Sequence, residues 1–373
     1  MVIKTSNGYK DIQDKSMVKW TPIIKMVNFH PSTTLDACSI LLSRLFMPQS
    51  RKSQISLIDT PYYHCVSRCV RQSFLCGTNA LTGQSYEHRR GWVEERLLFL
   101  STVFAIDICA YAVMSNHTHV VLCVDKTLAD NWDTKSVLKR YHTLHKGTLL
   151  TQKFVNGDSL TQGELITLDD TVEIYRKRLY DISWFMRDLN EHIARQANKE
   201  DDCTGRFWEG RFKSQALLDE SAVLACMAYV DLNPIRAKIA KTPETAKHTS
   251  IKKRLHAVKH HQAQPSTLMP FAGSSRENMP HGIAYSLKDY CELIDTTGRC
   301  IRDDKPGYID NTQSPILERL GLDSAQWLAL TTEFEKHFCY AAGAEQMMNA
   351  FKRHTHHQRI RGMGKAKELL KRA

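Results

Sequence analysis

Two apolar runs joined by a very short link constrain the fold of this chain more than any other feature. The runs span residues 106–114 and 117–125, both are rich in β-branched side chains, and residues 115–116 between them suit a turn. A link this short cannot hold the crossover that parallel strands need, so the runs predict adjacent antiparallel strands. Because side chains alternate along a strand, His117 and His119 point to the same face at the start of the second strand.

These two histidines are candidate metal ligands. Two neutral imidazoles on one face, with Thr118 turned to the other, form a natural pair of ligands for a divalent ion. The chain has 17 histidines, so a chance pair of surface or half-buried strand histidines is the alternative interpretation. A second motif, further along the chain, favours the metal site.

That second motif is a tyrosine and an amide on one face of a predicted helix over residues 219–240. The segment begins with acidic and capping residues and continues in Ala, Leu and Met, which is typical of a helix start. Tyr229 and Asn233 are four positions apart and share a face. Pro234 lacks an amide hydrogen, so the helix should kink or end near Asn233. Tyr229 is therefore a candidate nucleophile beside a polar ligand, with core packing as its alternative role.

With both motifs in place, the chain resembles the single-tyrosine HUH transposases, and most closely the REP-associated tyrosine transposases. Four pieces carry the resemblance in the family's order: residues 63–68, 111–119, 205–212 and 229–237. They cover residues 58–241, a little under half of the chain. The middle residue of the family's histidine motif is usually bulky and apolar, whereas here it is Thr118, which is still β-branched and favours a strand.

The resemblance implies a role for each matching side chain. His117 and His119 would bind a catalytic divalent metal, Tyr229 would be the nucleophile, and Asn233 would take the place of a third, helix-borne ligand. It also implies a ferredoxin-like core, an antiparallel sheet flanked by helices, and a substrate of single-stranded DNA that carries a hairpin.

The chemistry agrees with these roles. Cutting a phosphodiester needs a nucleophile and a cation that neutralises charge on the non-bridging oxygens. Nitrogen ligands suit Mn²⁺, while an otherwise oxygen-rich site filled by DNA suits Mg²⁺, so we expect one of these two ions. A phenol has a pKa of about 10 and is a poor nucleophile when neutral, and a nearby dication favours the phenolate. Attack would conserve the bond energy in a covalent 5′-phosphotyrosine, and the released 3′ hydroxyl could reverse the step.

Composition fits a protein that binds nucleic acid. The chain carries 51 Lys and Arg against 40 Asp and Glu, and its pI is about 9.1. The last residues, 351–373, hold one acid, Glu368, and these basic residues: Lys352, Arg353, Arg359, Arg361, Lys365, Lys367, Lys371 and Arg372. This basic tail is either a solvated or disordered segment or an arm that binds DNA.

A second basic segment lies inside the region of resemblance. Residues 206–214 alternate charged and aromatic side chains and are predicted to form a strand with both kinds on each face. Arg206, Arg211 and Lys213 are candidate contacts to DNA phosphates, together with Arg68 on the first strand.

We expect an α+β protein in three parts. They are a basic N-terminal extension (1–55), the catalytic domain (56–241) and a mostly helical C-terminal accessory region that could bind DNA (242–373). The catalytic domain is predicted to contain strands at 61–68, 106–114, 117–125 and 206–214, helices at 91–104, about 134–146, 172–198 and 219–240, and a polar insertion at 147–170. In the C-terminal region short helices are predicted at 286–294, 316–321 and 323–338. Tyr175 and Tyr180 are rivals of Tyr229 for the role of nucleophile, but they lie in a segment that is apolar at helical spacing, where packing is their expected role.

The remaining expectations concern the environment. The chain has eleven cysteines, an odd number, several of them inside apolar segments, which favours free thiols in a reducing bacterial cytoplasm and no structural zinc. No apolar run approaches the roughly 18 to 20 residues needed to span a bilayer. We expect association with the nucleoid through DNA, and a homodimer would let Tyr229 of one chain serve the histidines of another.

Two other functions remain open. A domesticated relative could bind DNA without cutting it, and binding of that kind would persist in chelator. The same chemistry could also serve a replication or mobilisation nickase. Palindromes that flank the gene would favour the transposase.

Overall fold

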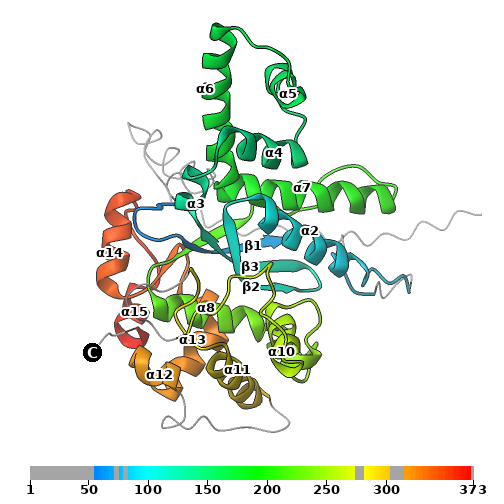
Figure 1. Cartoon of the computed structure of the whole chain (residues 1–373). Coiled ribbons are helices and arrows are strands. Elements are labelled where there is room, and N and C mark those ends of the chain that lie inside the picture. Colours follow the sequence, from blue (N-terminus) through cyan, green and yellow to red (C-terminus); the bar gives the residue numbers. More distant parts are fainter. Residues whose placement is uncertain (1–53, 71–74, 79–82, 274–280, 303–314, 371–373) are drawn as a thin grey trace, which may run out of the picture. The chain divides into compact units, whose positions relative to one another are not determined.

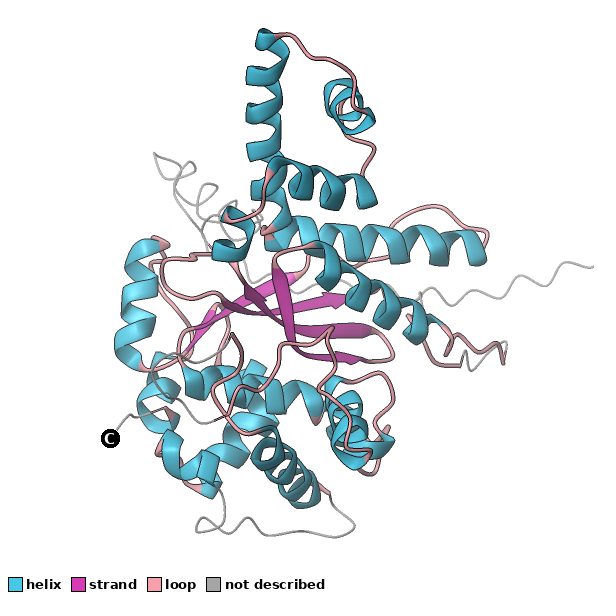
Figure 2. Cartoon of the chain, in the orientation of Figure 1, coloured by secondary structure: helices cyan, strands magenta, loops and turns pink. Residues whose placement is uncertain are grey.

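A five-stranded mixed sheet lies at the centre of the computed structural model (Figures 1 and 2). Its strand order is β2-β3-β1-β4-β5, and it is flanked by helices. The strands are β1 (Tyr62–Arg68), β2 (Ile106–Val113), β3 (His117–Val124), β4 (Lys213–Leu217) and β5 (Ala341–Ala342). The structure describes residues 54–70, 75–78, 83–273, 281–302 and 315–370. The expected N-terminal extension, 1–55, therefore falls almost entirely outside the described residues.

The prediction of a wholly antiparallel sheet was wrong at one edge. The pairs β2–β3, β1–β3 and β1–β4 are antiparallel, as the short link between β2 and β3 requires, but β4 and β5 run parallel. The parallel strand comes from the C-terminal region, and only a long connection can bring it beside β4 in that direction. The chain is thus α+β, as predicted, and a ferredoxin-like topology stays a prediction.

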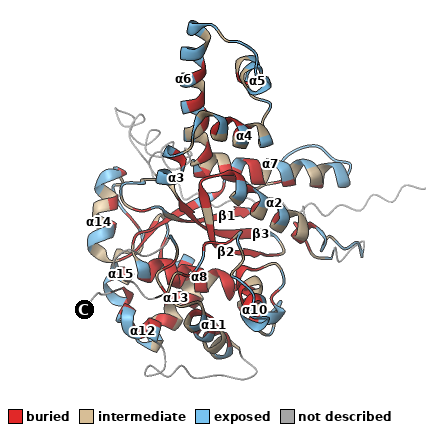
Figure 3. Cartoon of the chain, in the orientation of Figure 1, coloured by how far each residue is buried: buried red, intermediate tan, exposed pale blue. Residues whose placement is uncertain are grey.

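Helices cover the sheet on two sides (Figure 1). α2 (Arg89–Val103) contacts β2 and packs against α7 (Ile182–Glu200), and α8 (Glu220–Asp231) contacts β2, β3 and β4 from the other side. Nearly every residue of α8 is buried, because this Ala-, Leu- and Met-rich helix lies between the sheet and α13 (Ser324–His337) (Figure 3). The tyrosine helix, as we call α8 because it carries Tyr229, is therefore part of the core.

Two predictions between β3 and α7 were wrong. The polar insertion at 147–170 contains α5 (Leu149–Asn156) and the start of α6 (Gln162–Leu179). The overlooked signals are local caps: Thr148 caps α5, Gly157 ends it at φ 85°, and Thr161 forms a capping box with Glu164. The long helix at 172–198 is broken after α6, because Asp181 caps α7 by accepting bonds from two backbone amides. The short α3 (Lys126–Asp130) and α4 (Thr134–Leu144) precede this region.

The strand predicted at 206–214 begins only at Lys213. Earlier residues make one isolated bridge, Cys69 to Trp208, and then bend. Gly210 weakens strand pairing there, and the mixture of charges and rings offers no apolar face to bury. The alternation of side chains between two faces that was predicted for residues 206–214 therefore does not hold before Lys213, where β4 begins.

The C-terminal region is largely helical, as predicted. The described helices that follow α8 are α9 (Asn233–Arg236), η2 (Pro243–Thr245), α10 (Ser250–Lys259), α11 (Leu287–Ile301), α12 (Pro315–Leu320), α13, α14 (Glu345–His354) and α15 (Met363–Leu369). The basic tail is folded as far as residue 370, so its described part is not a disordered segment. The described residues all belong to one compact unit, and contacts such as β4–β5 and α8–α13 cross residue 241. The domain boundary at 241 stays a prediction.

Candidate functional site

Two buried histidines stand on one face of the sheet. In the register of β1 and β3, Val66 lies opposite His119, and His64 is two residues before Val66. Alternation therefore puts the side chains of His64 and His119 on the same face. Both side chains are buried, and His64 Nε2 lies 3.0 Å from His119 Nδ1.

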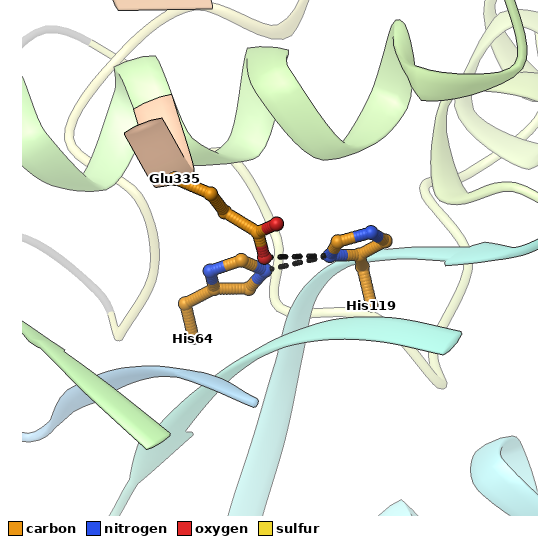
Figure 4. Close-up of side chains that lie close together, drawn as sticks. All are labelled: His64, His119 and Glu335. Atoms are coloured by element: carbon orange, nitrogen blue, oxygen red, sulfur yellow. Dashed lines mark hydrogen bonds and ion pairs between the residues drawn. The ribbon is translucent and has the colours of Figure 1, made fainter. Parts of the chain in front are cut away.

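Glu335 joins these histidines from the C-terminal region. It lies in α13, and its Oε1 is 3.6 Å from His119 Nδ1. One ligand atom from each of His64, His119 and Glu335 lies within 4.8 Å of the other two. Figure 4 shows the carboxylate pointing from α13 toward the two rings. Among the described His, Cys, Asp and Glu residues, this group is a candidate metal site.

His117 stands next to His119 but outside that group. The two rings meet edge to face with centroids 4.7 Å apart, so the prediction that they share a face is confirmed. His117 Nδ1 lies 2.6 Å from the side-chain oxygen of Asn116. Burial and the Arg68 guanidinium lower the pKa of His117 to about 4.

All three imidazoles are neutral at pH 7. Burial lowers the pKa of His64 and of His119. The neighbouring His64 and His117 rings lower the pKa of His119 further. Neutral imidazoles are the form that binds metals. The buried His119 Nε2 has no hydrogen-bond partner in the described structure, and a bound ion would satisfy it. The residues present therefore fit a divalent ion.

Tyr229 lies against the histidines. Its ring is half-buried in α8, with centroid distances of 5.9 Å to His119 and 6.3 Å to His64. The guanidinium carbon of Arg236 lies 3.9 Å from the centre of the Tyr229 ring, and Arg236 also donates to the carbonyl of Thr331. The predicted nucleophile and the second histidine of the motif are thus brought together within one chain.

The charged groups near Tyr229 have opposite effects on its pKa. Burial raises the pKa of Tyr229 to about 12, the Glu335 carboxylate adds to the rise, and the Arg236 guanidinium reduces it. Without a bound cation, the phenol is therefore protonated at neutral pH. A cation near the oxygen would favour the phenolate.

The helix breaks where the proline predicts. α8 ends at Asp231, and α9 begins at Asn233 with Pro234 in its first turn. Asn233 is buried one helical turn after Tyr229. Its role as a third ligand stays a prediction.

A basic cleft adjoins the group of three formed by His64, His119 and Glu335. Its volume is about 380 Å³, and three of the four predicted DNA contacts line it together with a residue of the basic tail: Arg68, Arg211, Lys213 and Arg361. His64 and Glu335 also line the cleft, with Glu209 as its other acid. The remaining predicted contact, Arg206, is exposed before β4. A surface with this charge balance, open to the histidine group, suits a phosphate backbone.

The rival tyrosines have packing roles. Tyr175 is buried, its ring stacks on Tyr141 with centroids 3.6 Å apart, and its hydroxyl accepts a hydrogen bond from the Thr148 amide. Tyr180 follows α6 and packs against the core.

Sequence reasoning missed two members of the group. His64 lies in the strand predicted at 61–68, and alternation along that strand places its side chain on the same face as that of Arg68. Glu335 lies in a predicted helix, but no local signal separates it from the other acids on that helix.

No family model and no curated protein match the chain. Among solved structures, the chain is similar to one described as a REP-associated tyrosine transposase bound to a REP hairpin. The two share 13% identity over 63% of this chain and 98% of that chain, with a TM-score of 0.32. No helix in the described part of the chain is both long enough and apolar enough to cross a membrane.

Proposed function

We propose that this chain is a metal-dependent transposase that cuts and rejoins single-stranded, hairpin-bearing DNA through Tyr229. The observation that carries the proposal is the meeting of Tyr229 with His119 and His64, since these residues come from three separate elements. Packing alone does not require a tyrosine, two neutral histidines and a carboxylate beside a basic cleft. Such a set is expected where charge on a phosphodiester must be stabilised.

The proposed step is a displacement at phosphorus. The Tyr229 oxygen forms a bond to phosphorus and loses its proton, and the bond from phosphorus to the 3′ oxygen breaks. The 3′ oxygen gains a proton, and the 5′ phosphate remains esterified to the tyrosine. The reverse reaction with another 3′ hydroxyl joins strands.

A bound Mg²⁺ or Mn²⁺ would supply positive charge for the phosphate oxygens and for the tyrosine oxygen. His119 is the residue that the histidine motif and the group of three share, so we assign it as a ligand. His117 and Asn233 are the further ligands that the resemblance implies. Arg236 holds a second positive charge over the Tyr229 ring.

The proposal also gives the basic cleft a role. Arg68, Arg211, Lys213 and Arg361 would hold the strand next to Tyr229. Arg206 would contact DNA further along. Binding to DNA in this way would associate the protein with the nucleoid.

Labelled single strands with palindromes from the flanks of the gene test the proposal. We expect cleavage with Mg²⁺ or Mn²⁺, and no cleavage in chelator or with His119→Ala. The Tyr180→Phe variant is the matched control for Tyr229→Phe, and only the latter should lose cleavage. Strand binding that persists in chelator, with no cleavage under either ion, would instead establish a DNA-binding protein without transferase activity.

A further inference from the structure

A series of buried hydrogen bonds runs across three strands and ends at His119. Gln215 Oε1 on β4 lies 3.3 Å from His64 Nδ1 on β1, and His64 Nε2 lies 3.0 Å from His119 Nδ1 on β3. All three side chains are buried. The series of hydrogen bonds ends at His119, whose Nε2 has no hydrogen-bond partner among the described residues.

The ring geometry shows that the contact between the histidines is a hydrogen bond. The two rings are nearly parallel, at 12°, with centroids 5.2 Å apart. With nitrogens 3.0 Å apart, this is close to the largest centroid separation that two imidazoles can have, so both nitrogens lie almost on the line between the ring centres. Figure 4 shows the rings side by side.

This geometry leaves no room for an ion between the two nitrogens. The lone pair of an imidazole nitrogen points outward in the ring plane, so His64 Nε2 and His119 Nδ1 point at each other. Two metal–nitrogen bonds of about 2 Å along one line would need nitrogens about 4 Å apart. The observed 3.0 Å instead matches one N–H donor facing one acceptor.

The acceptor at Gln215 determines which nitrogen donates in each of these hydrogen bonds. An amide oxygen only accepts, so His64 Nδ1 carries the hydrogen and His64 Nε2 accepts. His119 Nδ1 must then donate to His64 Nε2, and the carboxylate oxygen Glu335 Oε1 lies 3.6 Å from the same nitrogen. An imidazole that binds a metal is neutral and carries one proton, which in His119 is the proton donated from Nδ1. The lone pair of His119 is therefore on Nε2.

We propose that His64 and Gln215 are positioning residues that hold His119 as its Nδ1-protonated tautomer, so that Nε2 is the metal-binding atom. The inference rests on the proposed function for the presence of the metal. Metal-binding histidines usually donate their second N–H to a fixed acceptor, and loss of that acceptor weakens metal binding by roughly 10- to 100-fold. Here a second histidine serves as that acceptor.

The tautomers can be measured directly in the full-length, metal-free protein. Long-range proton–nitrogen spectra of protein labelled at histidine nitrogens distinguish Nδ1–H from Nε2–H, with His64→Gln and His119→Gln used for assignment. We expect Nδ1–H on both His64 and His119. An Nε2–H signal for His119 would overturn the proposal.

Binding of Mn²⁺, followed by electron paramagnetic resonance without DNA, gives the second readout. His64→Leu removes the acceptor and should weaken binding by roughly 10- to 100-fold, whereas His64→Gln keeps an acceptor oxygen and should restore most of the affinity. Glu335→Gln should bind nearly as well as the wild type. Equal losses in both His64 variants, a large loss in Glu335→Gln, or no loss in His64→Leu would each overturn the proposal.

These outcomes separate the inference from the proposed function. Protein with the expected tautomers and variant pattern that cleaves no strand would refute the transferase and leave the positioning role intact. Protein that cleaves DNA but carries Nε2–H on His119 would refute the positioning role alone.

Discussion

The buried carboxyl of Asp231 allows a quantitative test of how the tyrosine helix is held. Asp231 is two residues after Tyr229 in α8 and is fully buried. One carboxyl oxygen accepts from the Ile251 amide at 3.0 Å and from the Ser250 hydroxyl, and the other accepts from the Tyr290 hydroxyl at 2.8 Å. These partners lie in α10 and α11, so the carboxyl joins α8 to the C-terminal region.

The expected pH dependence follows from the pKa. Burial raises the pKa of Asp231 from 3.8 to about 6, because the cost of desolvating the charged form exceeds the stabilisation from its hydrogen bonds and from Arg254. The folded protein therefore binds this proton more tightly than the unfolded chain. The resulting stability is fully present below about pH 4 and is lost as the pH rises through 6. A shift of about two pKa units corresponds to roughly 3 kcal/mol.

The assay is urea unfolding of the wild type and of Asp231→Asn at a series of pH values from 4 to 7. The amide cannot ionise, so the free energy of unfolding of the wild type should fall, relative to that of the variant, by roughly 3 kcal/mol across the range. Asp158→Asn makes the same change at an exposed position and should follow the wild type. Parallel profiles for the wild type and Asp231→Asn would refute the reasoning.

Three further predictions concern the site. Arg361→Gln should weaken binding to single-stranded oligonucleotides and reduce the slope of log affinity against log salt by about 0.7. Arg359→Gln, on the same segment but outside the cleft, should leave the slope unchanged. Equal slopes for the two variants would exclude Arg361 from the DNA interface. Arg236→Gln should raise the pKa of Tyr229 further and move the rise of the cleavage rate to higher pH, and Arg236→Lys should partly restore it; unchanged pH–rate profiles would contradict this. Glu335→Gln removes a charge that raises the same pKa, so its profile should move to lower pH, and a shift to higher pH would contradict the role assigned to the carboxylate.

Local pattern was sufficient to predict the elements that present the site. The short link between β2 and β3 requires a hairpin, and alternation then puts His117 and His119 on one face, where their rings meet. The composition of α8 and the backbone chemistry of Pro234 likewise define a buried helix with a break after Tyr229. Each of these features depends on residues close together in the sequence.

The group around His119 could not be predicted in the same way. His64 reaches His119 through the register of β1 and β3, and Glu335 arrives through the packing of α13 on α8. Both depend on tertiary contacts between distant segments, which no local spacing encodes. The broken helix near Asp181 is a different case, because its capping signal was present in the sequence and was outweighed by apolar periodicity.

The central claim is tested most directly by mapping the covalent adduct between the protein and a cleaved single strand. Purified protein is incubated with Mg²⁺ or Mn²⁺ and the hairpin-bearing strands that it cuts, then digested and sequenced by mass spectrometry. The account predicts a 5′-phosphotyrosine on Tyr229 that is absent in chelator and in Tyr229→Phe. An adduct on Tyr175 or Tyr180, or cleavage without any protein adduct, would contradict it.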